Sequence, residues 1–225
     1  MSCWARNLFR IFIVGFALGT SSLAIGAEYK GLSTQNPLFG EPSVGITSVI
    51  VKTVTGMLEG DIRQLAYKDD IYHNEIIETF EESATEITFL DDTLLSLGPN
   101  SKITLDRFIY DPNPDASSFV MTITAGALRF VSGNLPSQAY QIHTPTATIG
   151  IRGTIIYVVV ERTAGKTGVL VTSVSLTVLD GEAEFVTCDG AKHRVTKGQS
   201  RIIRDAAAIG CARGNGKRRG VVEGL

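Results

Sequence analysis

The 225-residue chain has few of the residues on which protein chemistry usually depends. It contains three histidines, three cysteines and one tryptophan, and 21 Lys plus Arg nearly balance 23 Asp plus Glu. This charge balance gives no basic surface for a nucleic acid backbone, which argues against nucleic acid as a partner. His73, His143 and His193 stand singly, without metal-ligand spacing, and the Gly-x-Ser-x-Gly motif is absent. The sequence therefore predicts no enzyme, no metal site and no cofactor.

The apolar run that is typical of an export signal or a membrane segment lies near the N-terminus. Arg6 and Arg10 precede an apolar stretch over 11–18, and small residues follow it as far as Ala27. This order is typical of a secretory signal peptide, and the stretch is shorter than the roughly 20 apolar residues that span a bilayer. We therefore predict a signal peptide over 1–27, export, and no stable membrane span after cleavage. An uncleaved membrane anchor is the alternative.

The cysteines fit a chain that leaves the cytoplasm. Cys3 would be removed with the signal peptide, which leaves Cys188 and Cys211 as a pair. A disulfide between them would close a short loop and stabilise the fold by about 3 kcal/mol. The alternative is that both are unpaired, buried side chains.

Most of the remaining chain alternates apolar and polar residues with a period of two, and turn residues recur at short intervals. This pattern predicts an all-β fold, as a single β-sandwich or jelly-roll-like domain, with a short β-solenoid-like roll as the alternative. We expect an extended arm over 28–44, the all-β domain over 45–204 and a flexible C-terminal tail over 205–225. The predicted core is Leu95, Leu97, Ile103, Leu105, Phe108, Met121, Ile123, Leu128, Phe130, Ile149 and Ile151.

Several local patterns invite more specific interpretations. Residues 155–160 and 169–171 are continuously apolar, which predicts strands that are covered on both faces or packed at the centre of a sandwich. A Gly-Lys-Thr sequence over 165–167 lacks the strand–loop–helix context of a phosphate loop, so it predicts a hairpin turn. Alternating Asp and Asn over 111–115 lacks the Gly and Glu of a calcium loop and predicts a turn. A helical turn is expected near 70–73, and the pairs Asp69-Asp70, Glu81-Glu82 and Asp91-Asp92 are expected in solvated turns and edges.

The stretch TPTATIGIRGT over 144–154 consists of small residues, two glycines and one arginine. Read as one strand, its threonines and Arg152 lie on one face and its apolar residues on the other. Glycine in a strand marks close approach of a neighbouring backbone, so the stretch predicts a structural seam. Arg152 is either exposed or paired with a carboxylate, and a contact with a partner protein is the alternative.

Four motifs in order give the chain a resemblance to a known family. They are LSLGPNS (95–101), LDRF (105–108), GALRFVSG (126–133) and TPTATIGIRGT (144–154). Together they resemble the FecR-like periplasmic domain, with looser similarity over about 51–199. The chain differs from the family regulators in having only about ten residues before the apolar run, so it is similar to a stand-alone form without the anti-sigma segment. Asp92 stands where the family usually has Gly.

The resemblance implies a periplasmic, non-enzymatic binding or signal-relay module that contacts another cell-envelope protein. One alternative is a structural or accessory component of a secretion or adhesion system. Another is a carbohydrate or small-ligand binder, in which Tyr67, Tyr72, Tyr110 and Tyr140 would provide the aromatic platforms, since Trp4 lies in the signal peptide. The sequence specifies neither the partner nor the oligomeric state.

Overall fold

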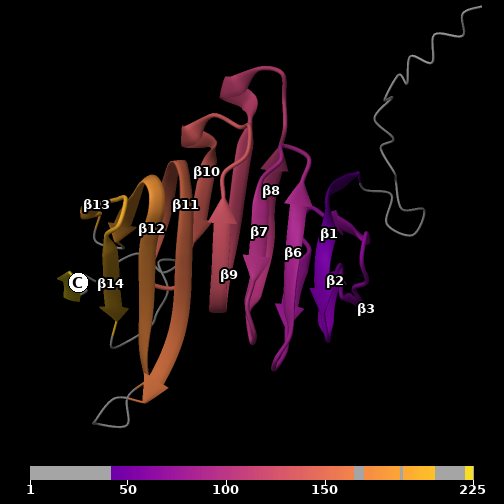
Figure 1. The fold of residues 1–225 in the computed structure, drawn as a ribbon, viewed down its shortest axis with the longest axis horizontal. Coiled ribbons are helices and arrows are strands. Elements are labelled where there is room, and N and C mark those ends of the chain that lie inside the picture. The colour runs from indigo at the N-terminus through magenta and orange to yellow at the C-terminus, as the bar shows by residue number, and fades with distance from the viewer. Residues whose placement is uncertain (1–41, 165–169, 188–189, 206–220, 225) are drawn as a thin grey trace, which may run out of the picture. The chain divides into compact units, whose positions relative to one another are not determined.

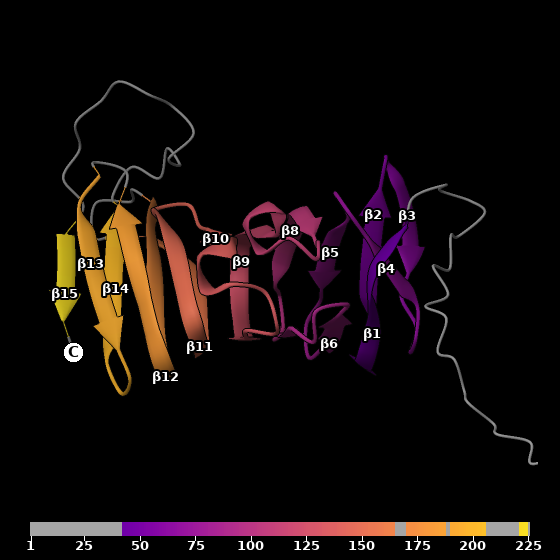
Figure 2. The same ribbon diagram turned by 90° about the horizontal axis from the view of Figure 1, so that it is seen from above.

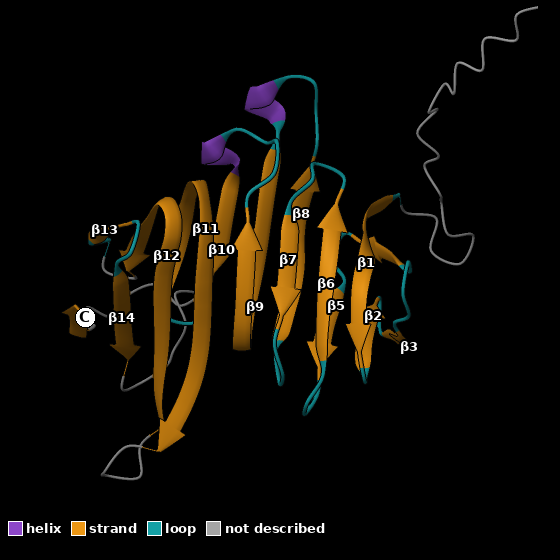
Figure 3. Cartoon of the chain, viewed as in Figure 1, coloured by secondary structure: helices purple, strands orange, loops and turns teal. Residues whose placement is uncertain are grey.

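The computed structural model describes residues 42–164, 170–187, 190–205 and 221–224, all within one compact unit, Ser33–Leu225 (Figures 1 and 3). The described residues form strands and two short 3-10 helices, which confirms the all-β prediction. The strands are β1 Ser43–Val51, β2 Val54–Leu58, β3 Asp61–Gln64, β4 Asp70–Tyr72, β5 Ile76–Thr79, β6 Ala84–Phe89, β7 Leu94–Leu97, β8 Lys102–Ile109, β9 Ser118–Val131, β10 Tyr140–His143, β11 Ala147–Ala164, β12 Leu170–Thr187, β13 Lys192–Thr196, β14 Ser200–Asp205 and β15 Val221–Gly224. The 3-10 helices are η1 Pro114–Ala116 and η2 Ser137–Ala139.

The strands pack in two layers, which Figure 2 shows from above. The front layer, nearer the viewer in Figure 1, has the order β4-β1-β6-β7-β9-β11-β12-β14-β15. The back layer has the order β3-β2-β5-β8-β9-β10-β11-β12-β13. The two packed layers agree with the predicted sandwich. Within each layer the strands lie side by side in almost the order in which they occur along the chain, which is the feature expected of the solenoid-like alternative.

Three long strands, β9, β11 and β12, belong to both layers. The first half of β9 pairs with β8 and β10, and its second half pairs with β7 and β11. Each of the three strands changes layer at a glycine with positive φ, namely Gly126 (+84°), Gly153 (+55°) and Gly181 (+73°). Glycine adopts this backbone conformation without steric strain, so these three residues determine where the chain crosses between the layers.

The crossings reverse the side-chain alternation. On β9 the buried residues are Phe119, Met121 and Ile123 before the crossing, and Leu128 and Phe130 after it. Odd-numbered positions therefore face the core in the back layer, and even-numbered positions face it in the front layer. The same reversal occurs on β11 and β12.

The core lies between the layers and contains every predicted core residue, with Phe108 only partly buried. Aromatic rings meet edge-on at its centre, with centroids 4.9 Å apart for Phe89 and Phe119 and 5.4 Å apart for Phe119 and Phe130. Such pairs each contribute about 0.5–1.5 kcal/mol beyond the apolar area that they bury.

The seam over 144–154 differs in part from the prediction. The apolar residues Ala147, Ile149 and Ile151 face the core, as expected. Thr144, Thr146 and Thr154 are also buried, so the prediction of a single threonine-lined outer face is wrong. β11 begins only at Ala147, and the bend at Gly153 turns Thr154 inward.

Two further predictions are wrong at least in part. Residues 155–160 are not covered on both faces, because they lie in the front layer, and Tyr157 is 43% exposed. Their inward side chains Ile156, Val158 and Val160 do pack in the core, which agrees with the alternative of a strand inside a sandwich. Leu170, at the start of β12, is 62% exposed. The expected helical turn near 70–73 is the short strand β4, which pairs with β1.

Candidate functional site

The histidines lie in different parts of the fold, and two of them contact neighbouring protein groups. Nε2 of His73 lies 2.8 Å from the carbonyl oxygen of Asp106, and Nδ1 of His143 lies 3.1 Å from Oγ1 of Thr148. His193 lies on the edge strand β13. Within the described ranges, no group of three or more His, Cys, Asp or Glu residues is placed to hold a metal ion. Among the same residues, no helix is long and apolar enough to cross a membrane.

Arg152 lies on the outer face of the back layer. Its side chain is 62% exposed, and Nη1 lies 3.8 Å from Oε1 of Glu182. The same Glu182 oxygen accepts a hydrogen bond of 3.0 Å from Nη2 of Arg194. Exposed ion pairs of this kind contribute little to stability.

Several sequence predictions fall outside the described residues. They are the signal peptide over 1–27, the Gly-Lys-Thr turn over 165–167, the disulfide between Cys188 and Cys211, and most of the arm predicted over 28–44 and of the tail predicted over 205–225. The strands on either side of the Gly-Lys-Thr sequence pair antiparallel, with Ala164 opposite Leu170.

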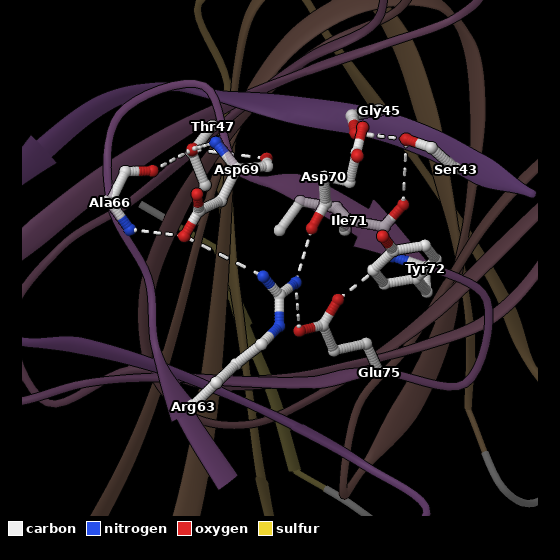
Figure 4. Close-up of polar contacts among 10 residues, drawn as sticks. All are labelled: Ser43, Gly45, Thr47, Arg63, Ala66, Asp69, Asp70, Ile71, Tyr72 and Glu75. Atoms are coloured by element: carbon white, nitrogen blue, oxygen red, sulfur yellow. Dashed lines mark hydrogen bonds and ion pairs between the residues drawn. The ribbon is translucent and has the colours of Figure 1, made fainter. Parts of the chain in front are cut away.

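A buried ion pair joins the first strands of the two layers (Figure 4). Nη2 of Arg63, on β3, donates a hydrogen bond of 2.9 Å to Oε1 of the fully buried Glu75. The second carboxylate oxygen accepts a hydrogen bond of 2.9 Å from the backbone N–H of Tyr72. Burial raises the pKa of the Glu75 carboxyl group, and the Tyr72 N–H and the Arg63 guanidinium oppose this shift.

The rest of the Arg63 side chain links β3 to β4. Its guanidinium donates to the Asp70 carbonyl oxygen and lies 3.8 Å from Oδ2 of Asp69. Its central carbon lies 5.5 Å from the centre of the Tyr72 ring, within the range of a cation–π contact. Since β3 and β4 are the outermost strands at the beginning of the two layers, this network closes one end of the apolar core. The terminal units of stacked folds need such polar closure to remain soluble.

A second buried network fixes the loop before η2. Oδ2 of Asp91 accepts hydrogen bonds from Thr93 Oγ1 at 2.7 Å and from the Tyr140 hydroxyl at 2.8 Å. The Tyr140 hydroxyl in turn accepts one of 2.9 Å from the backbone N–H of Leu135. Burial, together with the nearby Asp91 carboxylate, raises the pKa of Tyr140 to about 12. The prediction that Asp91 is solvated is therefore wrong, because its side chain turns inward and is fully buried.

A cleft of about 560 Å³ lies beside this loop. Its lining residues are Tyr110, Asp111, Pro112, Ser117, Asn134, Leu135 and Pro136. Several polar groups here already have partners within the protein, since Asp111 Oδ1 accepts from the Asn113 N–H at 2.7 Å and Asn134 Nδ2 donates to Asp92 at 2.7 Å. The first of these bonds confirms the turn predicted over 111–115. Tyr110, which is 54% exposed, is the aromatic ring of the lining.

Several motif residues form hydrogen bonds or close contacts where the strands cross between the layers. The Ser101 hydroxyl accepts from the N–H of Ala127 at 2.9 Å, and a Cβ on Gly126 would lie 2.3 Å from its Oγ. Likewise, the Ser132 hydroxyl accepts from the Thr154 N–H at 2.9 Å. These hydroxyl groups satisfy backbone groups where the strands bend and leave their ladders, so both serines stabilise the crossings.

Sequence reasoning missed both buried networks. Arg63 and Glu75 lie outside the four motifs, and nothing in their local sequence distinguishes them from solvated charges. For Asp91, the sequence indicated only an acidic residue in a turn between two strands, and not a buried carboxylate.

Comparisons with known proteins place the motifs in a family. Residues 75–184 match the family model described as FecR protein. No curated protein matches the sequence. Two crystal structures of a candidate anti-sigma factor from Parabacteroides distasonis are 12% and 14% identical to the chain, with TM-scores of 0.43 and 0.41. Each similarity covers 66% of this chain and 59% of the other, so the chain spans less than two thirds of those structures.

The matched region contains all four motifs, from Leu95 to Thr154. It also includes all three crossing glycines, Gly126, Gly153 and Gly181. Residues 75–184 of this chain thus match the FecR protein family, which confirms the resemblance given by the motifs.

Proposed function

We propose that the chain is an exported, non-enzymatic FecR-like module that contacts another cell-envelope protein and relays a signal without turnover. The observation that carries this proposal is the FecR match over residues 75–184. Within this match, the motif side chains Ser101 and Ser132 bind backbone groups at the layer crossings, which supports a structural role for them. Function then rests with the strand edges, loops and outer faces that the motifs hold in place.

The edge strand β3 is the surface that fits such a contact best. It pairs with β2 on one side, and no other described strand pairs with its second side. Ile62 on β3 is 70% exposed, and Tyr67 in the following loop is 64% exposed. An exposed strand edge can accept an extended segment of a partner through main-chain hydrogen bonds, while side chains such as Ile62 provide specificity. Arg152 offers a second contact residue on the back layer.

Photo-crosslinking in the producing cell tests this proposal. A photoreactive amino acid at Ile62 is expected to give one discrete adduct with an envelope protein, identified by mass spectrometry. The matched control carries the same residue at Thr196, an exposed position on β13 at the other end of the back layer. No adduct at Ile62, or identical adducts at both positions, would contradict the proposal.

Fractionation of the cells that carry the photoreactive residue tests export. Fractionation of the cells is expected to recover the protein from the periplasm, with residues 1–27 removed. Deletion of residues 2–27 should retain the protein in the cytoplasm and abolish the Ile62 adduct. Recovery of the deleted form in the periplasm would contradict a signal peptide in this segment.

One observation favours a second candidate function, a carbohydrate or small-ligand binder. The cleft beside Tyr110 has a volume in the range of small-ligand sites and offers an aromatic ring with nearby polar groups. Tyr72 and Tyr140 are buried and cannot act as platforms. Calorimetric titration with chitotriose separates the two functions: heat of binding that is lost in Tyr110→Ala would favour the ligand binder, and no heat is expected from a protein-binding module.

A further inference from the structure

The outer face of the front layer has a similar pattern on the two sides of β7, the fourth of its nine strands, as far as β1 and β11. Strands β6 and β9 flank β7, and β1 and β11 lie beyond them. The cross-strand register aligns their outward residues in three rows, each running from β1 to β11. The rows are Ile46, Thr88, Leu94, Val131 and Ile155; Val49, Glu86, Ser96, Arg129 and Tyr157; and Val51, Ala84, Ala127 and Val159.

Residues on β1 and β11, at equal distances from β7, are apolar on both sides. Ile46 on β1 corresponds to Ile155 on β11, and Val51 corresponds to Val159. The apolar side chains at the ends of the rows are exposed by 40% for Ile46, 44% for Val49, 43% for Val51 and 43% for Tyr157. The face therefore carries exposed apolar side chains on β1 and on β11, on either side of a more polar middle, and groups of exposed apolar side chains that are rimmed by polar residues are typical of an interaction surface. Neither view of the fold shows a described segment covering it (Figures 1 and 2).

The only charges in the three rows also occupy corresponding positions, with opposite signs. Glu86 lies on β6 and Arg129 on β9, one strand to either side of β7. The Glu86 carboxylate accepts hydrogen bonds from the hydroxyl groups of Ser48 and Ser96, at 3.4 and 3.0 Å, and has no cation among the described residues. Arg129 is partly buried and makes no ion pair with any residue that the structure describes.

Within one chain the two charges do not meet. They are two strands apart, a separation of about 10 Å at the usual strand spacing. A partly buried guanidinium on an apolar face is unfavourable without a carboxylate partner, and Arg is the side chain best suited to a planar, paired contact with one. A second copy of this chain supplies that carboxylate.

We propose that the front layer is a self-association interface, in which two copies pack face to face around a two-fold axis along β7. This axis places Glu86 of each copy opposite Arg129 of the other, so the contact contains two identical ion pairs. It also brings Ile46 opposite Ile155 and Val49 opposite Tyr157. The geometry is that of two aligned sheets packed about 10 Å apart. The β3 edge stays open in this dimer, so the interface does not depend on the proposed envelope contact.

A charge-exchange experiment tests the interface in protein purified from the producing cell. Sedimentation velocity is expected to show a dimer for the wild type. Glu86→Arg and Arg129→Glu should each raise the dimer dissociation constant at least about tenfold, because each places like charges opposite one another in both halves of the contact. The double variant Glu86→Arg/Arg129→Glu restores opposite charges and should return the constant to within about threefold of the wild type.

Two further variants make the outcome unambiguous. Arg152→Glu changes an equally charged residue on the back layer and should leave the dimer unchanged. Val49→Lys places a charge in the apolar part of the face and should weaken the dimer without disturbing the core, since Val49 is 44% exposed. A monomeric wild type would overturn the proposal and leave the face to another protein or to another part of the chain. A double variant as weak as the two single variants would overturn it as well.

Discussion

At the scale of single residues, glycine determines where the long strands change layer. A Cβ at Gly181 would lie 2.1 Å from the carbonyl oxygen of Gly153, and its φ of +73° is unfavourable for other residues. We expect Gly181→Ala to lower the free energy of unfolding by at least about 2 kcal/mol. Urea denaturation followed by circular dichroism measures this loss.

Gly150 provides a matched control within the FecR motif. A Cβ there would meet no atom within 4 Å, and its φ is not in the left-handed region. Gly150→Ala should therefore change the stability by less than about 0.5 kcal/mol. Equal effects of the two substitutions would contradict a crossing at Gly181.

Tyr140 gives the buried Asp91 network a measurable pH dependence. Its pKa is raised from an ordinary 10.0 to about 12 in the folded protein, so the folded state holds the hydroxyl proton more tightly than the unfolded state. The resulting stabilisation is present below about pH 10 and is lost as the pH rises from 10 towards 12. Tyr140→Phe should lack this part of the pH dependence in urea titrations. Tyrosinate absorbance of the folded wild type should contain a late-ionising component that Tyr140→Phe removes, and an unchanged titration curve in Tyr140→Phe would contradict the assignment.

At the scale of elements, the Arg63–Glu75 pair joins β3, β4 and β5. Arg63→Ala leaves a buried carboxylate without its cation, which should lower the free energy of unfolding at pH 7 by about 3–5 kcal/mol. Because burial raises the pKa of Glu75, the folded state takes up its proton at a higher pH than the unfolded state. The loss should therefore be smaller near the ordinary pKa of 4.5 and grow as the pH rises above it.

Arg152→Ala is the control for this experiment, because it removes an exposed guanidinium 3.8 Å from its carboxylate. Its effect should be below about 1 kcal/mol at either pH. An equally small effect of Arg63→Ala would show that the network does not hold the end of the core together.

The sequence predicted most strands but not the paths of the longest ones. A period of two identified the inward faces, and the inward residues on β6, β7 and β8 follow it without interruption as far as Leu105. The alternation reverses within β9, β11 and β12 because each strand changes layer, and a single strand pattern cannot represent this change. Residues 155–160 looked buried on both faces because their outer side chains are apolar as well, and their exposure follows from the layer in which they lie.

The buried polar groups escaped sequence reasoning for a different reason. Glu75 is paired with a residue 12 positions away, and Asp91 with one 49 positions away. Such contacts depend on the order of strands in the two layers, which the local sequence does not specify. The FecR motifs could be recognised because their residues act at the crossings, close to one another in space and at fixed spacing in the chain.

At the scale of the whole molecule, the strands of each layer lie side by side in almost the order in which they occur along the chain. The two proposed contact surfaces therefore lie in different places. The β3 edge lies at one end of the back layer, and the face around β7 lies on the front layer. One surface can therefore bind an envelope protein while the other joins two copies. In the proposed arrangement, each dimer would present two β3 edges related by the two-fold axis.

Cross-strand nuclear Overhauser effects along β9 measure most directly whether the FecR motifs build a crossing between two layers. In isotopically labelled protein, Phe119 should show backbone contacts to Tyr140 of β10, and Leu128 should show them to Leu97 of β7 and Val158 of β11. The change of partners should fall at Gly126. Backbone contacts from β9 to β8 and β10 that continue beyond Gly126 to Val131, with none to β11, would contradict the crossing.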